Sequence, residues 1–290
     1  MATNTPFGQR LGLVLEGGAM RGIYTAGVLD VFLEAGIMPD VVVGVSAGAL
    51  HGCSYVAGQK GRSIRYYRKY RSDKHFMGLY SLLTTGDVVG TKFCYEDIPL
   101  RLDPFDEAAF EKAPVDFYVT VTNVRTGKPE YILCDELKVG SKMDVIRAGA
   151  SMPLCSKMVE WNGNLYLDGG VSDSIPYAKM KDFGCHKSIV VLTQPAGYLK
   201  QPAAMAPFEA MYRKYPAFVE AMRGRDQMYN TEVCAVEQAA KQGDVFLIRP
   251  SKLLHVGRME HDIEVLNAQY ELGRQDARNQ MDAMREWMER

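Results

Sequence analysis

The sequence predicts an α/β fold, a three-layer α/β/α arrangement around a mainly parallel central sheet. Two observations near the start of the chain carry this prediction. An apolar run at 10–15 leads through a glycine loop at 16–22 into residues with helical spacing, and a second apolar run at 40–43 leads into a helix pattern at 47–57. Strands that alternate with helices in this way form parallel sheets covered by helices.

Six later segments are predicted as strands because they alternate or are apolar throughout and lie between turn residues. They are 117–122, 130–133, 157–161, 164–167, 188–193 and 244–249. We expect the first two to form a hairpin and the last two to be buried parallel strands. The pair around the Asn162-Gly163 turn leads directly to Asp168.

Helices are expected at 61–71, 143–150, along 205–222 and from 259 onward, with Ser141 as the cap of the second. Two interpretations stay open for 61–71, where arginines recur every three residues among tyrosines. We favour a solvated face over contact with anionic lipid head groups. The Met and aromatic stripe at 205–222 is favoured as core over an adaptable acyl-chain surface.

Composition excludes several classes of function. Lys+Arg of 34 against Asp+Glu of 35 gives a net charge of −1, which argues against a nucleic-acid partner. The six cysteines are far apart and form no metal or redox motif, so no metal ion or cofactor is expected. Residues 1–7 do not resemble a secretory signal, and no apolar run is long enough to span a membrane. A cytoplasmic protein is the resulting expectation.

The segment Gly44-Val45-Ser46-Ala47-Gly48 has the G-x-S-x-G pattern of a nucleophile elbow. A serine at such a strand-to-helix turn is forced into a strained backbone conformation. Gly44 and Gly48 suit it because a β-carbon would collide with the neighbouring strand or helix. The turn exposes the hydroxyl and directs the next amide, that of Ala47, to the same space.

Three elements are expected to converge on one site. The loop Gly17-Gly18-Ala19 follows the first strand, Ser46 follows the second, and Asp168 with Gly169 comes much later in the chain. Ligands of parallel sheets bind at the carboxyl ends of strands, so the first two loops can face one crevice. The fold is expected to bring the third there.

With these residues the chain resembles the patatin-like phospholipases. The resemblance covers about 11–191, in the chain order glycine loop with a basic residue (Arg21), G-x-S-x-G, and Asp-Gly-Gly. It includes the small-residue and proline block 147–153. The family usually has a third glycine where this chain has Ala19. That alanine keeps the amide but narrows the backbone conformations of the loop.

The resemblance implies a patatin-like fold and a catalytic dyad without histidine. Ser46 would attack an ester carbonyl and Asp168 would accept its proton, so burial must raise the carboxylate's pKa. The implied oxyanion hole consists of the amides of Gly17, Gly18, Ala19 and Ala47. Supporting residues are Arg21, Gly22, Gly44, Gly48, Gly169 and Gly170. No metal is implied.

Other candidates are weaker. His51 follows Ser46 by five residues and is expected to be structural. Asp87 and Asp173 lack the setting of Asp168 after a strand and before glycines. Arg21 either steadies the glycine loop, which we favour, or contacts a phosphate head group. Glu16 is expected to anchor the same loop.

We expect residues 1–290 to form a single patatin-like domain, with a catalytic core at about 10–195 and a mostly helical extension at about 200–290. The expected activity is that of a serine lipid acyl hydrolase of phospholipase A or lysophospholipase type, acting on a lipid or acyl ester. Transient contact with a membrane surface stays open. One alternative is an esterase or thioesterase for small soluble acyl substrates. A nucleotide-binding module is a further alternative, although the loop 17–22 lacks the full phosphate-binding patterns, and so is a regulatory protein on a retired hydrolase scaffold.

Overall fold

The computed structural model describes residues 10–290, so the prediction about residues 1–7 lies outside the described residues. The described chain holds one eight-stranded sheet, with strand order β5-β6-β3-β2-β1-β7-β8 and β4 attached to β3. The strands are β1 (Arg10–Leu15), β2 (Val41–Val45), β3 (Asp116–Asn123), β4 (Pro129–Leu133), β5 (Val159–Trp161), β6 (Asn164–Asp168), β7 (Cys185–Val191) and β8 (Val245–Ile248).

Most of this sheet is parallel. The neighbours β3, β2, β1, β7 and β8 run in one direction. β4 and β6 pair with β3 in antiparallel fashion, and β5 pairs likewise with β6. The predicted hairpin is therefore confirmed as β3 and β4, and the predicted mainly parallel sheet is confirmed as well.

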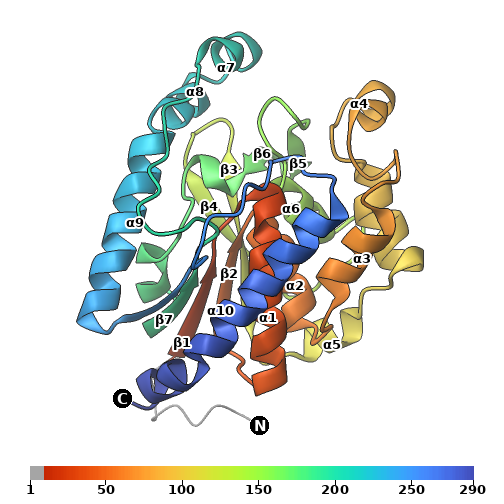
Figure 1. Ribbon diagram of the computed structural model, residues 1–290. Coiled ribbons are helices and arrows are strands. Elements are labelled where there is room, and N and C mark those ends of the chain that lie inside the picture. The colour runs from red at the N-terminus through yellow and green to blue at the C-terminus, as the bar shows by residue number, and fades with distance from the viewer. Residues whose placement is uncertain (1–9) are drawn as a thin grey trace.

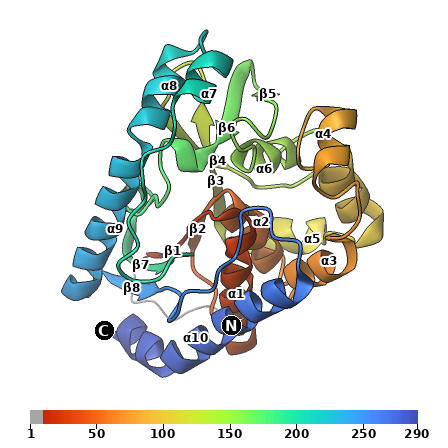
Figure 2. The same cartoon turned by 45° about the horizontal axis from the view of Figure 1, so that its top comes forward.

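Helices cover both faces of the sheet and complete three layers (Figure 1). α9 lies along one face, whereas α1, α2 and α10 cover the other; Figure 2 shows the same division from a second direction. The α-helices are α1 (Ile23–Ala35), α2 (Ala47–Val56), α3 (Arg62–Tyr70), α4 (Leu79–Thr85), α5 (Glu107–Lys112), α6 (Met143–Gly149), α7 (Ala206–Met211), α8 (Pro216–Arg223), α9 (Arg225–Gln242) and α10 (Ile263–Glu289). Short 3-10 helices are η1 (Ala19–Gly22), η3 (Gly169–Val171) and η4 (Ala178–Lys181), and η2 (Phe93–Leu102) is a π-helix.

The alternation of side chains along β1 explains why both faces need a cover. Leu13 and Leu15 pack into the core shared with α1 and α2, whereas Val14 packs into the core shared with α9. Successive strand residues point to opposite faces, so a strand such as β1, with no polar side chain between Leu11 and Leu15, must be buried on both sides. This strand lies in the middle of the sheet, as the order requires.

The C-terminal helix α10 packs along α1. Tyr270 donates a hydrogen bond to Asp30 at 2.5 Å, and Tyr24 donates one to Asp276 at 3.1 Å. Both pairs are buried, and they join residues about 240 to 250 positions apart. The end of the described chain is thereby attached to the helix that follows the glycine loop.

Three local predictions need correction. The residue before α6 is Lys142, and the Ser141 hydroxyl bonds to Glu136 instead of capping the helix. The stripe 205–222 is not one helix: α7 ends at Met211 and α8 begins at Pro216, because a proline cannot continue a preceding helix. The prediction that the side chains of this stripe belong to the core is confirmed only in part.

Helix α3 is also less solvated than predicted. Its tyrosines are buried as expected, but Arg62 is buried too. Among residues 10–290, no helix has the length and the apolar character that crossing a membrane requires.

Candidate active site

Ser46 occupies the turn between β2 and α2. Its backbone has φ 53° and ψ −123°, a region that costs a non-glycine residue roughly 1–3 kcal/mol. The two flanking glycines allow close packing around this turn. A β-carbon on Gly48 would lie 2.3 Å from the carbonyl oxygen of Leu15, and one on Gly44 would lie 2.5 Å from the α-carbon of Ala49.

Asp168 is the last residue of β6, and its carboxylate meets Ser46 directly. The Ser46 hydroxyl donates a hydrogen bond to Asp168 Oδ2 at 2.6 Å, across 122 residues of chain. The other carboxylate oxygen accepts the Gly170 amide at 2.8 Å. Gly169 is equally constrained, since a β-carbon there would lie 2.2 Å from the Thr120 carbonyl oxygen. The carboxylate is thus held by its own turn and aimed at the serine.

Burial raises the pKa of Asp168 above its usual value of 3.8. Loss of water around the carboxylate is the largest cause. Hydrogen bonds from Ser46 and Gly170 and the positive charges of Arg225 and Lys200 oppose it. The net direction makes the carboxylate a stronger base, which is the change that a proton acceptor for serine needs.

The glycine loop after β1 lies against the serine. A β-carbon on Gly17 would be 2.7 Å from the β-carbon of Ser46. Within residues 10–290, the amides of Gly17, Gly18, Ala19 and Ala47 donate no hydrogen bond. Ala19 has φ 49°, in the left-handed region that favours glycine. The alanine therefore occupies the conformation that a third glycine would supply.

Glu16 anchors this loop, as predicted. Its carboxylate accepts the Thr193 amide at 2.5 Å and the Tyr229 hydroxyl at 2.9 Å. Gly22 lies against α2, where a β-carbon would be 2.6 Å from that of Ala47. The segment that follows β7 and helix α9 thus hold the loop through one buried carboxylate.

The other acids and the histidine lie away from the serine. Both ring nitrogens of His51 are buried without a hydrogen-bond partner in the described chain, and burial lowers the pKa of the ring to about 3. Asp87 accepts the Lys157 amide at 2.5 Å, and Asp173 accepts the Tyr131 hydroxyl. None of these three side chains bonds to Ser46 or Asp168.

An apolar pocket of about 110 Å³ begins at Ser46. Its walls come from α2, α3, the π-helix η2 and α6, and include Leu50, Tyr67, Ile98 and Ile146. Sequence reasoning did not identify this pocket, because each of these four helices contributes only two to four of the lining residues. The lining suits a hydrocarbon chain.

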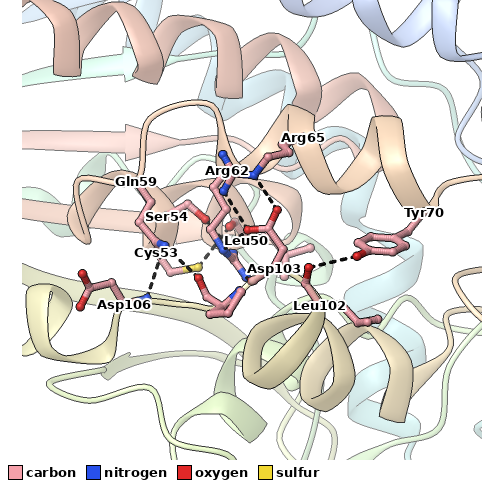
Figure 3. Close-up of polar contacts among 11 residues, drawn as sticks. Leu50, Cys53, Ser54, Gln59, Arg62, Arg65, Tyr70, Leu102, Asp103 and Asp106 are labelled. Carbon is pink, nitrogen blue, oxygen red and sulfur yellow. Dashed lines mark hydrogen bonds and ion pairs between the residues drawn. The ribbon is translucent and has the colours of Figure 1, made fainter.

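Figure 3 shows how the one charged group of this lining is neutralised. Arg62 donates to the Ser54 hydroxyl at 3.1 Å and to the Asp103 carbonyl oxygen at 3.0 Å. Arg65 donates two bonds to the Asp103 carboxylate at 2.7 and 2.8 Å. These contacts connect α3 to the segment after η2, so they hold two walls of the pocket together.

A second, polar pocket of about 200 Å³ also contains Ser46 and Asp168. Four basic side chains line it: Arg21, Lys200, Arg225 and Arg258. Sequence reasoning identified only the first of them. The other three follow residue 195, and their local sequence carries no motif that would have identified them.

The fold and this pair of residues define the class of protein. It is an α/β protein in which a strained serine bonds directly to a buried carboxylate near the carboxyl ends of parallel strands. The family model described as patatin-like phospholipase matches residues 13–180, which is more than half of the chain. The chain therefore belongs to the patatin-like phospholipase family. A second model, a domain of unknown function (DUF6363), matches residues 215–289.

Known relatives differ in how much of this chain they share. The uncharacterized protein YjjU of Escherichia coli K12 is 28% identical over 273 residues, which cover 91% of this chain and 75% of YjjU. Lysophospholipase NTE1 of Saccharomyces cerevisiae is 30% identical over 190 residues, or 63% of this chain. Lysophospholipase nte1 of Aspergillus terreus is 30% identical over 182 residues, or 61% of this chain. The chain spans 11% of the length of each lysophospholipase. A solved structure, VipD of Legionella pneumophila, is similar with a TM-score of 0.49 at 13% identity, covering 95% of this chain and 67% of VipD.

Proposed function

We propose that this chain is a serine hydrolase that cleaves lipid acyl esters, of phospholipase A or lysophospholipase type, with Ser46 as nucleophile and Asp168 as base. The observation that carries the proposal is the 2.6 Å hydrogen bond from Ser46 Oγ to Asp168 Oδ2. Family membership supports it, and so do relatives that are named lysophospholipases.

In the acylation step, Ser46 Oγ attacks the ester carbonyl carbon and its proton passes to Asp168. The carbon–oxygen bond to the alcohol then breaks, and the alcohol leaves with the proton from Asp168. A water molecule next attacks the acyl-enzyme and gives one proton to Asp168, which returns it to Ser46. The fatty acid is released and the enzyme is restored.

The oxyanion of each tetrahedral intermediate would be bound by amides beside Ser46. Those of Gly17, Gly18, Ala19 and Ala47 support this role because none donates a hydrogen bond elsewhere in residues 10–290. Loss of one oxyanion donor typically costs about 3–4 kcal/mol of transition-state stabilisation. The strained backbone of Ser46 is consistent with a preorganised nucleophile.

The apolar pocket supports a long acyl chain over the alternative of a small soluble ester or thioester. A hydrocarbon chain bound there gains from leaving water, whereas an acetyl group leaves the pocket unused. The chemistry at Ser46 is the same in both cases. Hydrolysis rates for acyl chains of increasing length decide between them.

Transient contact with a membrane surface is part of the proposal. Exposed apolar side chains on α4 support it, since Leu79 is 69% and Leu83 is 76% exposed. In Figure 1, α4 lies at the top, at the end where α1 begins after the glycine loop. Co-sedimentation with phospholipid vesicles tests this contact, and it should weaken when both leucines are replaced by serine.

The proposal is tested by covalent labelling and by product release. A fluorophosphonate should label Ser46, and the wild-type protein should release fatty acid from a monoacyl phospholipid. Ser46→Ala should abolish both and keep the melting temperature close to that of the wild type. Protein that is neither labelled at Ser46 nor releases fatty acid from any acyl ester would refute the proposal.

A further inference from the structure

The four basic side chains of the polar pocket lack carboxylate partners. Within residues 10–290, Arg21, Lys200, Arg225 and Arg258 form no ion pair, although pairs such as Arg65 with Asp103 occur elsewhere. Arg21, Lys200 and Arg225 are partly buried, whereas Arg258 is exposed at the edge of the cluster. Charged groups that leave water are normally paired or hydrogen-bonded, which applies to the first three. A cluster of unpaired cations around a cavity is therefore a site that an anion would complete.

Lys200 is held firmly in this cluster. Its backbone is bound at both polar atoms by Asn230 of α9, at 2.9 and 3.1 Å. Its ammonium nitrogen lies 3.8 Å from the centre of the Tyr229 ring. Burial and the charge of Arg225 lower the pKa of Lys200 to about 7. Glu16 and Glu232 act in the opposite direction but do not offset these causes. A bound anion would add negative charge beside Lys200 and relieve the repulsion from Arg225.

The arginines of the cluster also keep hydrogen-bond donors available. Arg225 donates through Nε to the Gly170 carbonyl at 2.5 Å, and no hydrogen bond of its other nitrogens is made within the described chain. Arg21 has a buried Nε without a partner there. Guanidinium groups with free donors suit the oxygens of a phosphate.

The cluster lines the second of two pockets that adjoin at the serine. Ser46, Ala19 and Met152 line both pockets, so the two cavities meet at the nucleophile. If the acyl chain occupies the apolar pocket, the alcohol part of the same ester extends into the polar one. The cations are then placed to contact the group that leaves.

We propose that the polar pocket binds a phosphate carried by the leaving group, and that Lys200 and Arg258 make the protein prefer anionic acyl substrates over neutral ones. This inference rests on the proposed function, because it names the substrate class of the same site. The phosphate can belong to a lysophospholipid head group or to the coenzyme A part of an acyl thioester. In both cases the acyl carbon–heteroatom bond breaks as above, and the leaving group takes the proton from Asp168.

The test compares palmitoyl substrates that differ only in the leaving group. These are monopalmitoylglycerol, lysophosphatidylcholine, lysophosphatidic acid and palmitoyl-coenzyme A, each below its critical micelle concentration. The wild type should show a kcat/KM at least about tenfold higher for one of the two anionic substrates than for monopalmitoylglycerol. Whichever anionic substrate is faster identifies the source of the phosphate.

Variants locate the preference in the pocket. The double variant Lys200→Gln/Arg258→Gln should lose most of the ratio of anionic to neutral kcat/KM. Arg213→Gln, which removes an exposed charge outside the pocket, should keep the ratio. A wild type without preference for an anion, or a double variant that keeps the full preference, overturns the inference.

A binding measurement separates this inference from the proposed function. Calorimetry with sn-glycerol 3-phosphate and the Ser46→Ala variant needs no turnover. Binding that weakens at least about tenfold when Lys200 and Arg258 are also replaced supports the pocket even if no ester is cleaved. Absent binding, or binding unaffected by the replacements, contradicts it even if esters are hydrolysed.

Discussion

The two pockets that meet at Ser46 differ in whether their positively charged side chains have carboxylate partners. In the apolar pocket, Arg62 is buried beside Asp103, which also accepts two hydrogen bonds from Arg65. In the polar pocket, four cations stand without a carboxylate partner in the described chain. A neutralised arginine contributes to the wall of its pocket, whereas unpaired cations attract a ligand.

The pockets also differ in where their residues come from. The walls of the apolar pocket lie between residues 19 and 152, within the region that matches the patatin-like model. Three of the four cations lie beyond residue 195, and two, Arg225 and Arg258, lie in the region that matches the domain of unknown function. We expect the first region to determine the chemistry and the acyl chain, and the second to determine the leaving group.

Narrowing the apolar pocket should have the larger effect on substrate choice. Leu50→Trp places a bulkier side chain in the lining, so kcat/KM for palmitoyl esters should fall about tenfold or more relative to acetyl esters. The control Leu133→Trp enlarges a side chain on β4 outside the pocket and should leave the chain-length preference unchanged. Equal loss for both chain lengths in Leu50→Trp would mean that the pocket does not hold the acyl group.

The leaving-group preference should depend on pH through Lys200. Its pKa is lowered to about 7, so the ammonium is charged below that pH and loses its proton above it. With lysophosphatidylglycerol, whose phosphodiester stays singly charged, the preference over monopalmitoylglycerol should fall severalfold as pH rises through about 7. Lys200→Gln should make the preference nearly independent of pH. A pH dependence that is unchanged in this variant would show that Lys200 does not cause it. The charged and titratable groups around Lys200 are Glu16, Arg21, Arg225, Tyr229 and Glu232.

The charges of the polar pocket also act on Asp168, which lines that pocket and not the apolar one. Burial raises the pKa of this carboxylate in the folded protein, and the charges of Arg225 and Lys200 partly offset that rise. Because the base must be ionised, kcat/KM should fall as pH falls through a value above 3.8. Lys200→Gln removes an opposing charge and should shift this acid limb to higher pH. Leu50→Trp should leave the limb in place, and a matching shift there would argue against the assignment.

The smallest expected effect concerns Ala19, which lines both pockets. Its φ of 49° is strained for alanine and free for glycine, so Ala19→Gly should raise the free energy of unfolding by up to about 1 kcal/mol. The matched Ala113→Gly, at φ −63°, should lower it by about 0.5–1 kcal/mol. Chemical denaturation measures both. A destabilised Ala19→Gly would show that the alanine side chain contributes packing that outweighs the strain.

Local patterns made the parallel strands and the elbow predictable. G-x-S-x-G after an apolar run and Asp-Gly-Gly after a short strand each carry their signal within a few residues. The break between α7 and α8 was missed because the apolar spacing continues through Tyr212 and Tyr215 although Pro216 starts a new helix. The assignment of residues 1–290 to a single domain stays a prediction.

The basic side chains that line the polar pocket could not be predicted from the sequence, apart from Arg21. Lys200 lies in a stretch without regular secondary structure, and Arg258 lies in another. Only the packing of α9 and of the loop before α10 brings them near Ser46, and no periodicity in the sequence reports such a contact. The dyad of Ser46 and Asp168, in contrast, could be predicted, because the resemblance to the family indicated both residues.

The turnover of Asp168→Asn tests the central claim most directly. Asparagine keeps nearly the same shape and can still bond to Ser46, but it cannot accept the serine proton as a base. We predict that kcat for a palmitoyl ester falls by at least about a thousandfold while the melting temperature stays within a few degrees of the wild type. An Asp168→Asn protein that is folded and retains most of its activity would contradict the account.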